Sequence, residues 1–245
     1  MNFIQRSTTA LSVLITLAPL SGFSAATLPA WYNAADATHT HLAHLFTTDD
    51  LTPAPDSNIN SNGTPVTTVN LGGFNDGWQE PNTIDQSGAD IDPGTPGRQT
   101  DGAWDLGVAG SIQSEINIAP SAPLSGMFYE VKFQVYAIAL DSLQRLPELE
   151  VVGHTAGDLT RSEVAVDGPT TLSGYWKGIT WTGTLQNVNT DQLTFSFNVP
   201  TDVDSTSIID SYEIFTSYTV VPEPSTSMML LGSALVLVSR RKRRA

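Results

Sequence analysis

The chain has 245 residues, of which 40% are hydrophobic, and it carries a formal net charge of −14 at pH 7. A surface this acidic repels nucleic acid and anionic lipid headgroups, so we expect no nucleic-acid partner. The chain contains no cysteine, which excludes a disulfide framework. The stability of the fold must therefore come from an apolar core.

The first 26 residues have the three parts of a secretory signal peptide. A cation at Arg6 precedes a nearly continuous apolar run over residues 10–20, and small residues follow at Ser24, Ala25 and Ala26. A signal peptidase that reads this pattern cuts after Ala26. A permanent membrane helix is disfavoured because the run is short and contains a proline. We therefore predict an exported domain over residues 27–221.

Three of the four histidines lie close together after the signal peptide, at His39, His41 and His44. Residues 34–46 are also the one long stretch with helical periodicity. A His-x-His pair on a strand, or His41 with His44 on a helix, could bind zinc together with Asp36. No further ligand is evident, so an exposed polar segment is the favoured interpretation.

Alternating apolar and polar residues predict an all-β fold for residues 27–221. The clearest strand is 127–139, where Tyr129, Val131 and Phe133 alternate with charged or polar residues. Weaker or shorter strands are expected at 66–71, 111–118, 149–152, 163–166, 171–185, 193–199 and 212–220. Many short strands without an internal repeat favour a single antiparallel β-sandwich, jelly-roll-like, over a solenoid or a propeller.

The interval 71–110 is long for a connection and is rich in glycine, proline, asparagine and aspartate. Carboxylate oxygens on a glycine-rich loop are the ligands that a structural calcium ion prefers, and no other cofactor is expected. The best candidates are Asp90, Asp92 and Asp101. The terminal bidentate glutamate of an EF-hand is missing, so a solvated loop is the favoured alternative. A second, weaker group is formed by Asp202, Asp204 and Asp210.

Several aromatic residues near the predicted loops could stack on sugar rings, as in carbohydrate-binding sandwiches. They are Trp31, Trp78, Trp104, Tyr175, Trp176 and Trp181. Tryptophan is on average highly buried, and Trp176 and Trp181 are expected to face opposite sides of one strand. Core packing is therefore the favoured interpretation for these side chains.

No catalytic motif is visible. The sequence has no Gly-x-Ser-x-Gly elbow, no His-Glu-x-x-His helix and no phosphate-binding loop. We therefore expect a protein that is not an enzyme. The alternative is a secreted carbohydrate-active hydrolase, because its carboxylate pair would be defined by separation in space and leave no sequence motif.

The C-terminal end combines three features in order. It has the motif Val221-Pro222-Glu223-Pro224-Ser225, an uncharged run over residues 228–238, and the cations Arg240, Arg241, Lys242, Arg243 and Arg244. The prolines stop regular structure. The run predicts a single hydrophobic helix, shorter than the roughly 20 residues that a spanning helix needs. The cations would act as a stop-transfer signal on the cytoplasmic side of an inner membrane.

This order resembles the PEP-CTERM sorting signal of Gram-negative bacterial surface proteins, over about the last tenth of the chain. The resemblance implies recognition by an exosortase, a membrane-embedded transpeptidase-like protease, and processing near Pro222-Glu223-Pro224. Such proteins often occur in organisms that make exopolysaccharide. Residues 222–245 would thus anchor the chain transiently in the inner membrane before its release to the cell surface or extracellular matrix. The expected function is a non-catalytic structural, adhesive or polysaccharide-contacting surface protein.

Overall fold

The computed structural model describes residues 28–80, 102–118, 127–141, 146–169, 174–201 and 207–222. All regular structure within these ranges is β-strand. Within the same ranges, no helix is long and apolar enough to cross a membrane. The predicted signal peptide and C-terminal hydrophobic helix lie outside the described residues.

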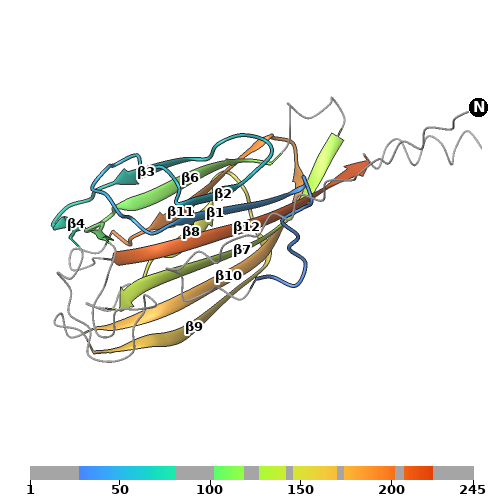
Figure 1. Ribbon diagram of the computed structural model, residues 1–245. Helices are drawn as coiled ribbons and strands as arrows, with labels where there is room; N and C mark the ends of the chain where they lie inside the picture. The colour runs from blue at the N-terminus through green and yellow to red at the C-terminus, as the bar shows by residue number, and fades with distance from the viewer. Residues whose placement is uncertain are drawn as a thin grey trace, which may run out of the picture.

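The strands form two antiparallel sheets (Figure 1). Sheet A contains β1 (His39–His44), β2 (Ser57–Ile59), β4 (Gly77–Gln79), β5 (Ala103–Asp105), β7 (Met127–Asp141), β9 (Gly157–Pro169), β10 (Tyr175–Val188) and β12 (Ile208–Pro222). Sheet B contains β3 (Val66–Asn70), β6 (Ser111–Asn117), β8 (Glu148–Val151) and β11 (Gln192–Asn198).

The order of sheet A is β2-β1-β12-β7-β10-β9, with β5 paired to β12 and β4 paired to β5. The order of sheet B is β3-β6-β11-β8. Most connections cross from one sheet to the other, so the two layers are interwoven. The predicted all-β fold with antiparallel sheets is confirmed, and the narrower jelly-roll description stays a prediction.

The main core lies between the two sheets and follows from the alternation along the long strands. In β7 the side chains of Val131, Phe133 and Val135 are buried, and Phe133 meets Phe195 of sheet B edge to face at 5.5 Å between ring centroids. Lys132 lies on the opposite face of the strand. Burial of each large apolar side chain in such a core stabilises the fold by about 1.5–3 kcal/mol.

A second apolar cluster lies on the opposite face of sheet A. It is formed by Ala103, Ile138, Leu140, Trp176 and Ile208. Trp176 belongs to this cluster whereas Trp181, on the same strand, belongs to the main core. The expectation that these two tryptophans face opposite sides of one strand is confirmed, and sheet A is therefore apolar on both faces around Trp176.

The helical periodicity of residues 34–46 is misleading, because these residues form turns followed by β1. Five of the six residues of β1 are buried, so the strand has no polar face and no period of two. Strands β2, β4 and β5 were also not predicted. They contain three residues each, which is too short for a periodic signal.

Candidate functional site

Strand β12 carries the chain from the core directly into the proline motif. Tyr212 and Ile214 are fully buried, and the pairing of β12 with β7 continues to Val221 opposite Phe128 and Pro222 opposite Met127. The first two motif residues thus belong to the sandwich itself, with no linker between them and the fold. Glu223, Pro224, Ser225 and the cations Arg240–Arg244 lie outside the described residues.

The last part of β12 extends beyond its other neighbour. Pairing between β1 and β12 ends at Ser217 opposite His39, and from Tyr218 onward β12 pairs with β7 alone among the described strands. Tyr218 packs edge to face on Tyr129 of β7, with 5.6 Å between ring centroids. The end of β12 projects from the body of the sandwich (Figure 1). A two-stranded ribbon therefore presents the start of the motif.

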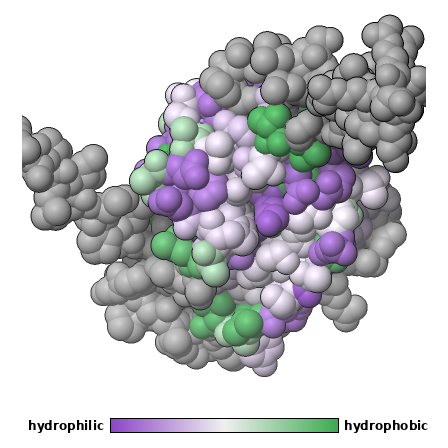
Figure 2. Space-filling view, turned by 90° about the vertical axis from the view of Figure 1, so that its right-hand side faces the viewer, coloured by the Kyte–Doolittle hydropathy of each residue, from purple (hydrophilic) through white to green (hydrophobic). Residues whose placement is uncertain are grey.

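Figure 2 looks onto the side of the molecule toward which β12 runs. On the described part of this face, hydrophobic residues form small groups separated by hydrophilic and neutral ones. A broad continuous apolar patch would mark a stable protein interface. The described part of this face shows no broad patch of that kind.

The three clustered histidines are divided between the two faces of β1. His44 points into the main core and is fully buried. Its Nε2 lies 2.8 Å from the hydroxyl of Thr67, which in turn contacts Ser114 at 3.0 Å and the Tyr212 hydroxyl at 3.3 Å. The hydroxyls of Ser114 and Tyr212 are 2.6 Å apart. These four residues tie β1 and β12 of sheet A to β3 and β6 of sheet B.

Burial has a clear effect on the ionisable groups of this cluster. It lowers the pKa of His44 to about 4, because the imidazolium would lose its hydration in the core. Burial also raises the pKa of Tyr212. Both groups are therefore neutral near pH 7. The network is enclosed in the core and is not accessible to a substrate, and Nδ1 of His44 has no hydrogen-bond partner within the described residues.

His41 lies on the outer face of sheet A. Its Nε2 is 2.8 Å from a carboxylate oxygen of Glu213, and its ring stacks on Phe215 at 4.4 Å between centroids. Tyr32, from the segment before β1, packs edge to face on Phe215 at 5.1 Å. The expected exposed polar segment is thus wrong for His41, because Tyr32 and Phe215 pack against it, and for His44, because it points into the main core.

The zinc hypothesis gains no support from this arrangement. Over the described ranges, no group of three or more histidine, cysteine, aspartate or glutamate side chains is placed to bind a metal ion. Asp36 instead accepts hydrogen bonds from the backbone and hydroxyl of Thr38 at 2.9 and 2.8 Å, which lowers the pKa of its carboxyl. The backbone N–H of Asn33 donates to Nδ1 of His39 at 2.8 Å.

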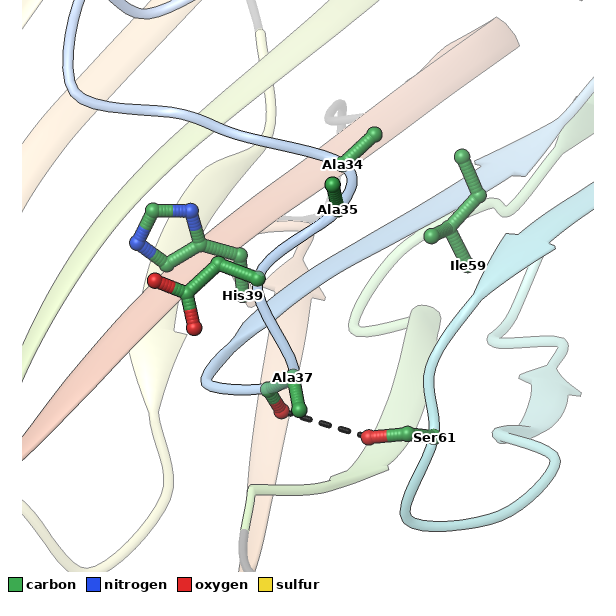
Figure 3. A pocket seen from close by; sticks show the side chains of 7 residues that line it. Ala34, Ala35, Ala37, His39, Ile59 and Ser61 are labelled. Carbon is green, nitrogen blue, oxygen red and sulfur yellow. Dashed lines mark hydrogen bonds between the residues drawn. The ribbon is translucent and has the colours of Figure 1, made fainter. Parts of the chain in front are cut away.

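A shallow hollow of about 190 Å³ lies beside this turn. It is lined by Ala34, Ala35, Asp36, Ala37, His39, Ile59 and Ser61. Figure 3 shows the hydroxyl of Ser61 donating to the carbonyl of Ala37, at 3.2 Å. The polar groups around the hollow are used to hold the turn together, so its geometry is that of a structural turn and not of a catalytic cleft.

The predicted calcium ligands Asp90, Asp92 and Asp101 lie outside the described residues, as do Asp202 and Asp204. Asp210 is buried in β12, where the register with β7 shifts. Asp105 is also buried, and its carboxylate accepts hydrogen bonds from the N–H groups of Gly107 at 3.0 Å and Asp76 at 3.1 Å. The Asp105 carboxylate therefore joins the segment before β4 to the turn after β5.

Both described ends of the interval 71–110 are fixed to the sandwich. Trp78 of β4 is the cross-strand partner of Trp104 of β5, and the Trp78 indole N–H donates to the carbonyl of Phe46 at 3.1 Å. Gly72 approaches the backbone so closely that a β-carbon there would lie 1.8 Å from the carbonyl oxygen of Val108. Only glycine fits this crossing.

Core packing is confirmed for three of the aromatic residues, Trp104, Trp176 and Trp181, which are at most 2% exposed. Trp31 and Trp78 are half-buried. Tyr175 is 50% exposed. The exposed aromatic that sequence analysis missed is Phe74, whose side chain is 88% exposed and whose φ of 53° lies in the left-handed region. The glycine-rich sequence around Phe74 is the feature that could have indicated an exposed loop there.

Sequence analysis also missed a row of charges at the β9 side of the sandwich. Arg161 contacts Glu148 at 3.2 Å and Glu163 at 2.9 Å, and its guanidinium lies 5.6 Å from the centroid of Trp181. Lys177 contacts Asp141 at 2.6 Å and Glu163 at 3.4 Å. The hydrogen bond to Asp141 raises the pKa of Lys177.

Comparison with known families identifies the tail. Residues 220–244 match the PEP-CTERM protein-sorting motif, which confirms the resemblance. No curated protein and no solved structure matches the chain. The motif implies an exosortase-targeted, exported protein on a sorting route to the cell surface or membrane. The match begins at Val220, so its first three residues are also the last three of β12.

Proposed function

Starting from an exported chain with a PEP-CTERM motif, we propose that the protein is a non-catalytic component of the cell surface or extracellular matrix. Its β-sandwich is displayed after an exosortase has processed the tail, and it contacts polysaccharide. One observation carries the proposal. The core strand β12 runs without a linker into the sorting motif. The domain that is sorted is therefore the β-sandwich.

The tail would act as a temporary anchor. Residues 228–238 carry no charge and are followed by Arg240–Arg244, a combination that favours retention in an inner membrane with the cations on the cytoplasmic side. Pro222 and Pro224 prevent β12 from continuing toward the membrane as a strand. The exosortase would meet an extended motif at the end of the β7 and β12 ribbon.

The proposal of a non-catalytic role rests on the hydrogen-bond partners of carboxylates in the described part of the chain. A glycoside hydrolase needs an acid whose pKa is raised and a second carboxylate across a cleft. The pKa of Asp36 is instead lowered by hydrogen bonds. Asp105 accepts two backbone N–H groups, and Glu213 is bound to His41. These side chains have structural partners, which supports a binding or structural role.

Phe74 supports polysaccharide contact. Its loop is held by a hydrogen bond from the Asn75 side chain to the Gly72 carbonyl at 2.7 Å, and by the backbone pairing of Gly73 with Val108. A nearly fully exposed aromatic ring on a braced loop offers a flat apolar face, and such faces commonly contact sugar rings.

We expect Phe74→Ala to weaken retention of the exported protein on exopolysaccharide from its host by roughly fivefold, since one aromatic contact contributes about 1 kcal/mol. Affinity electrophoresis in gels containing the polysaccharide measures this change. Leu51→Ala is the matched control, because it removes another exposed apolar side chain, 47% exposed, that has no aromatic ring. Equal retention of wild type and Phe74→Ala, or release of reducing sugar by the wild type, would contradict the proposed role.

Replacing Pro222, Glu223 and Pro224 together by alanine is expected to leave the chain in the membrane fraction of an exosortase-containing host. Replacing Thr226 and Ser227 by alanine, just after the motif, is the matched control and is expected to retain most of the surface display. Protease accessibility on intact cells, with fractionation, distinguishes the two variants. Normal display of the triple proline-motif variant would refute exosortase sorting through this motif.

A further inference from the structure

β9 is the longest edge strand in the described part of the chain. It contains 13 residues, pairs with β10 and ends the order of sheet A, and Figure 1 shows β9 at the lower rim of the molecule. The strands at the other ends of the two sheet orders, β2, β3 and β8, have three, five and four residues. A long edge presents a row of backbone groups that a further strand can join.

The middle of β9 is regular and carries little protection against such pairing. Its register with β10 shifts near both ends but is unbroken from Thr160 to Ala165. Proteins commonly block an edge with proline, charged side chains such as lysine, or a bulge. Residues 160–165 contain no proline, lysine or bulge, and their charged side chains are Arg161 and Glu163, which a partner strand must match. Val164, opposite Gly178 in β10, is 67% exposed. This part of the edge is therefore suited to pairing.

The charges of β9 identify what can pair with it. Arg161 and Glu163 are two residues apart and lie on the same face of the strand, with 27% and 37% of their side chains exposed. A two-fold axis through Ser162 places Arg161 of each copy opposite Glu163 of the second copy. The same operation places Thr160 opposite Val164 on the other face. The β9 edge is thus complementary to itself.

We propose that two copies of this chain associate through their β9 edges, antiparallel and centred on Ser162, so that the two copies of sheet A form one continuous sheet. Both cross-strand charge pairs form in this register. Moving the centre by one residue, to Arg161 or Glu163, places like charges directly opposite each other, which destabilises the pairing. The charges therefore select the register as well as the partner.

The test is sedimentation equilibrium of the mature protein recovered from the surface of its host, at about 0.15 M salt, where the Debye length of about 8 Å screens the negative charge on each copy. Arg161→Glu and Glu163→Arg each convert both pairs into like-charge pairs. We expect each to weaken dimerisation at least about tenfold, or 1.4 kcal/mol. Glu148→Gln, which removes an ion pair of Arg161 from outside β9, is expected to dimerise like the wild type.

An equimolar mixture of the two single variants decides the proposal. Each copy of Arg161→Glu carries two acids at these positions and each copy of Glu163→Arg carries two bases, so their heterodimer regains both opposite-charge pairs. The double variant, in which the charges are exchanged, is likewise expected to dimerise. A monomeric wild type, single variants as dimeric as the wild type, or a mixture that forms no heterodimer would overturn the proposal.

Discussion

Replacing Trp181 by alanine is expected to lower the free energy of unfolding by about 3–5 kcal/mol. Trp181 is 2% exposed in the main core, lies beside Val135 of β7 in register, and meets the ring of Phe197 in sheet B at 5.8 Å between centroids. Its loss leaves a cavity between the two sheets and removes the ring that Arg161 covers. Urea denaturation measures the effect as a lower midpoint with an unchanged slope.

Trp31→Ala is the control for this prediction. Trp31 is half-buried and lies outside both apolar clusters, so its replacement is expected to cost about 1 kcal/mol or less. Equal losses for Trp181→Ala and Trp31→Ala would show that the two sheets do not share the packed core described above.

Acidification from pH 6.5 to pH 4 is expected to remove about 3 kcal/mol of stability through His44 alone. Burial lowers the pKa of His44 from its ordinary value of 6.5 to about 4 on folding, and each pKa unit corresponds to about 1.4 kcal/mol. The unfolded chain takes up a proton at this site at a higher pH than the folded chain does. Stability is therefore complete above pH 6.5 and is lost as the pH falls toward 4.

His44→Phe isolates this contribution. The variant retains a ring between Phe46 and Tyr212, while Thr67 keeps its contacts to Ser114 and Tyr212. Denaturation midpoints at several pH values are expected to show a shallower acid loss in His44→Phe than in the wild type. His154→Gln, at a half-buried position outside the network, is expected to follow the wild type. Parallel curves for wild type and His44→Phe would contradict the assignment.

The long strands were predictable because each has one buried and one polar face over much of its length, as in β7. β1 was not predictable by the same argument. Leu42 and His44 face the main core, while His41 and Ala43 are buried on the outer face. A strand buried on both sides loses the period of two, and its histidines then resemble an exposed polar segment.

The candidate sites also differ in how far the sequence alone predicts them. The sorting motif was readable because Val221 to Ser225 are consecutive and their chemistry is local. The ribbon that presents it depends on β12 pairing with β7, more than 80 residues earlier in the chain. The His44 network and the β9 edge likewise depend on strand order, because Tyr212, Thr67 and Ser114 are distant in sequence and no local pattern specifies their contact.

The intact mass of the mature protein recovered from the cell surface tests most directly whether the sandwich is sorted through the motif that ends β12. We predict a chain that begins at Thr27, ends within or next to Pro222-Glu223-Pro224, and lacks residues 228–245, with or without an added group from transfer. A surface-displayed chain whose mass includes Arg240–Arg244 would contradict this account.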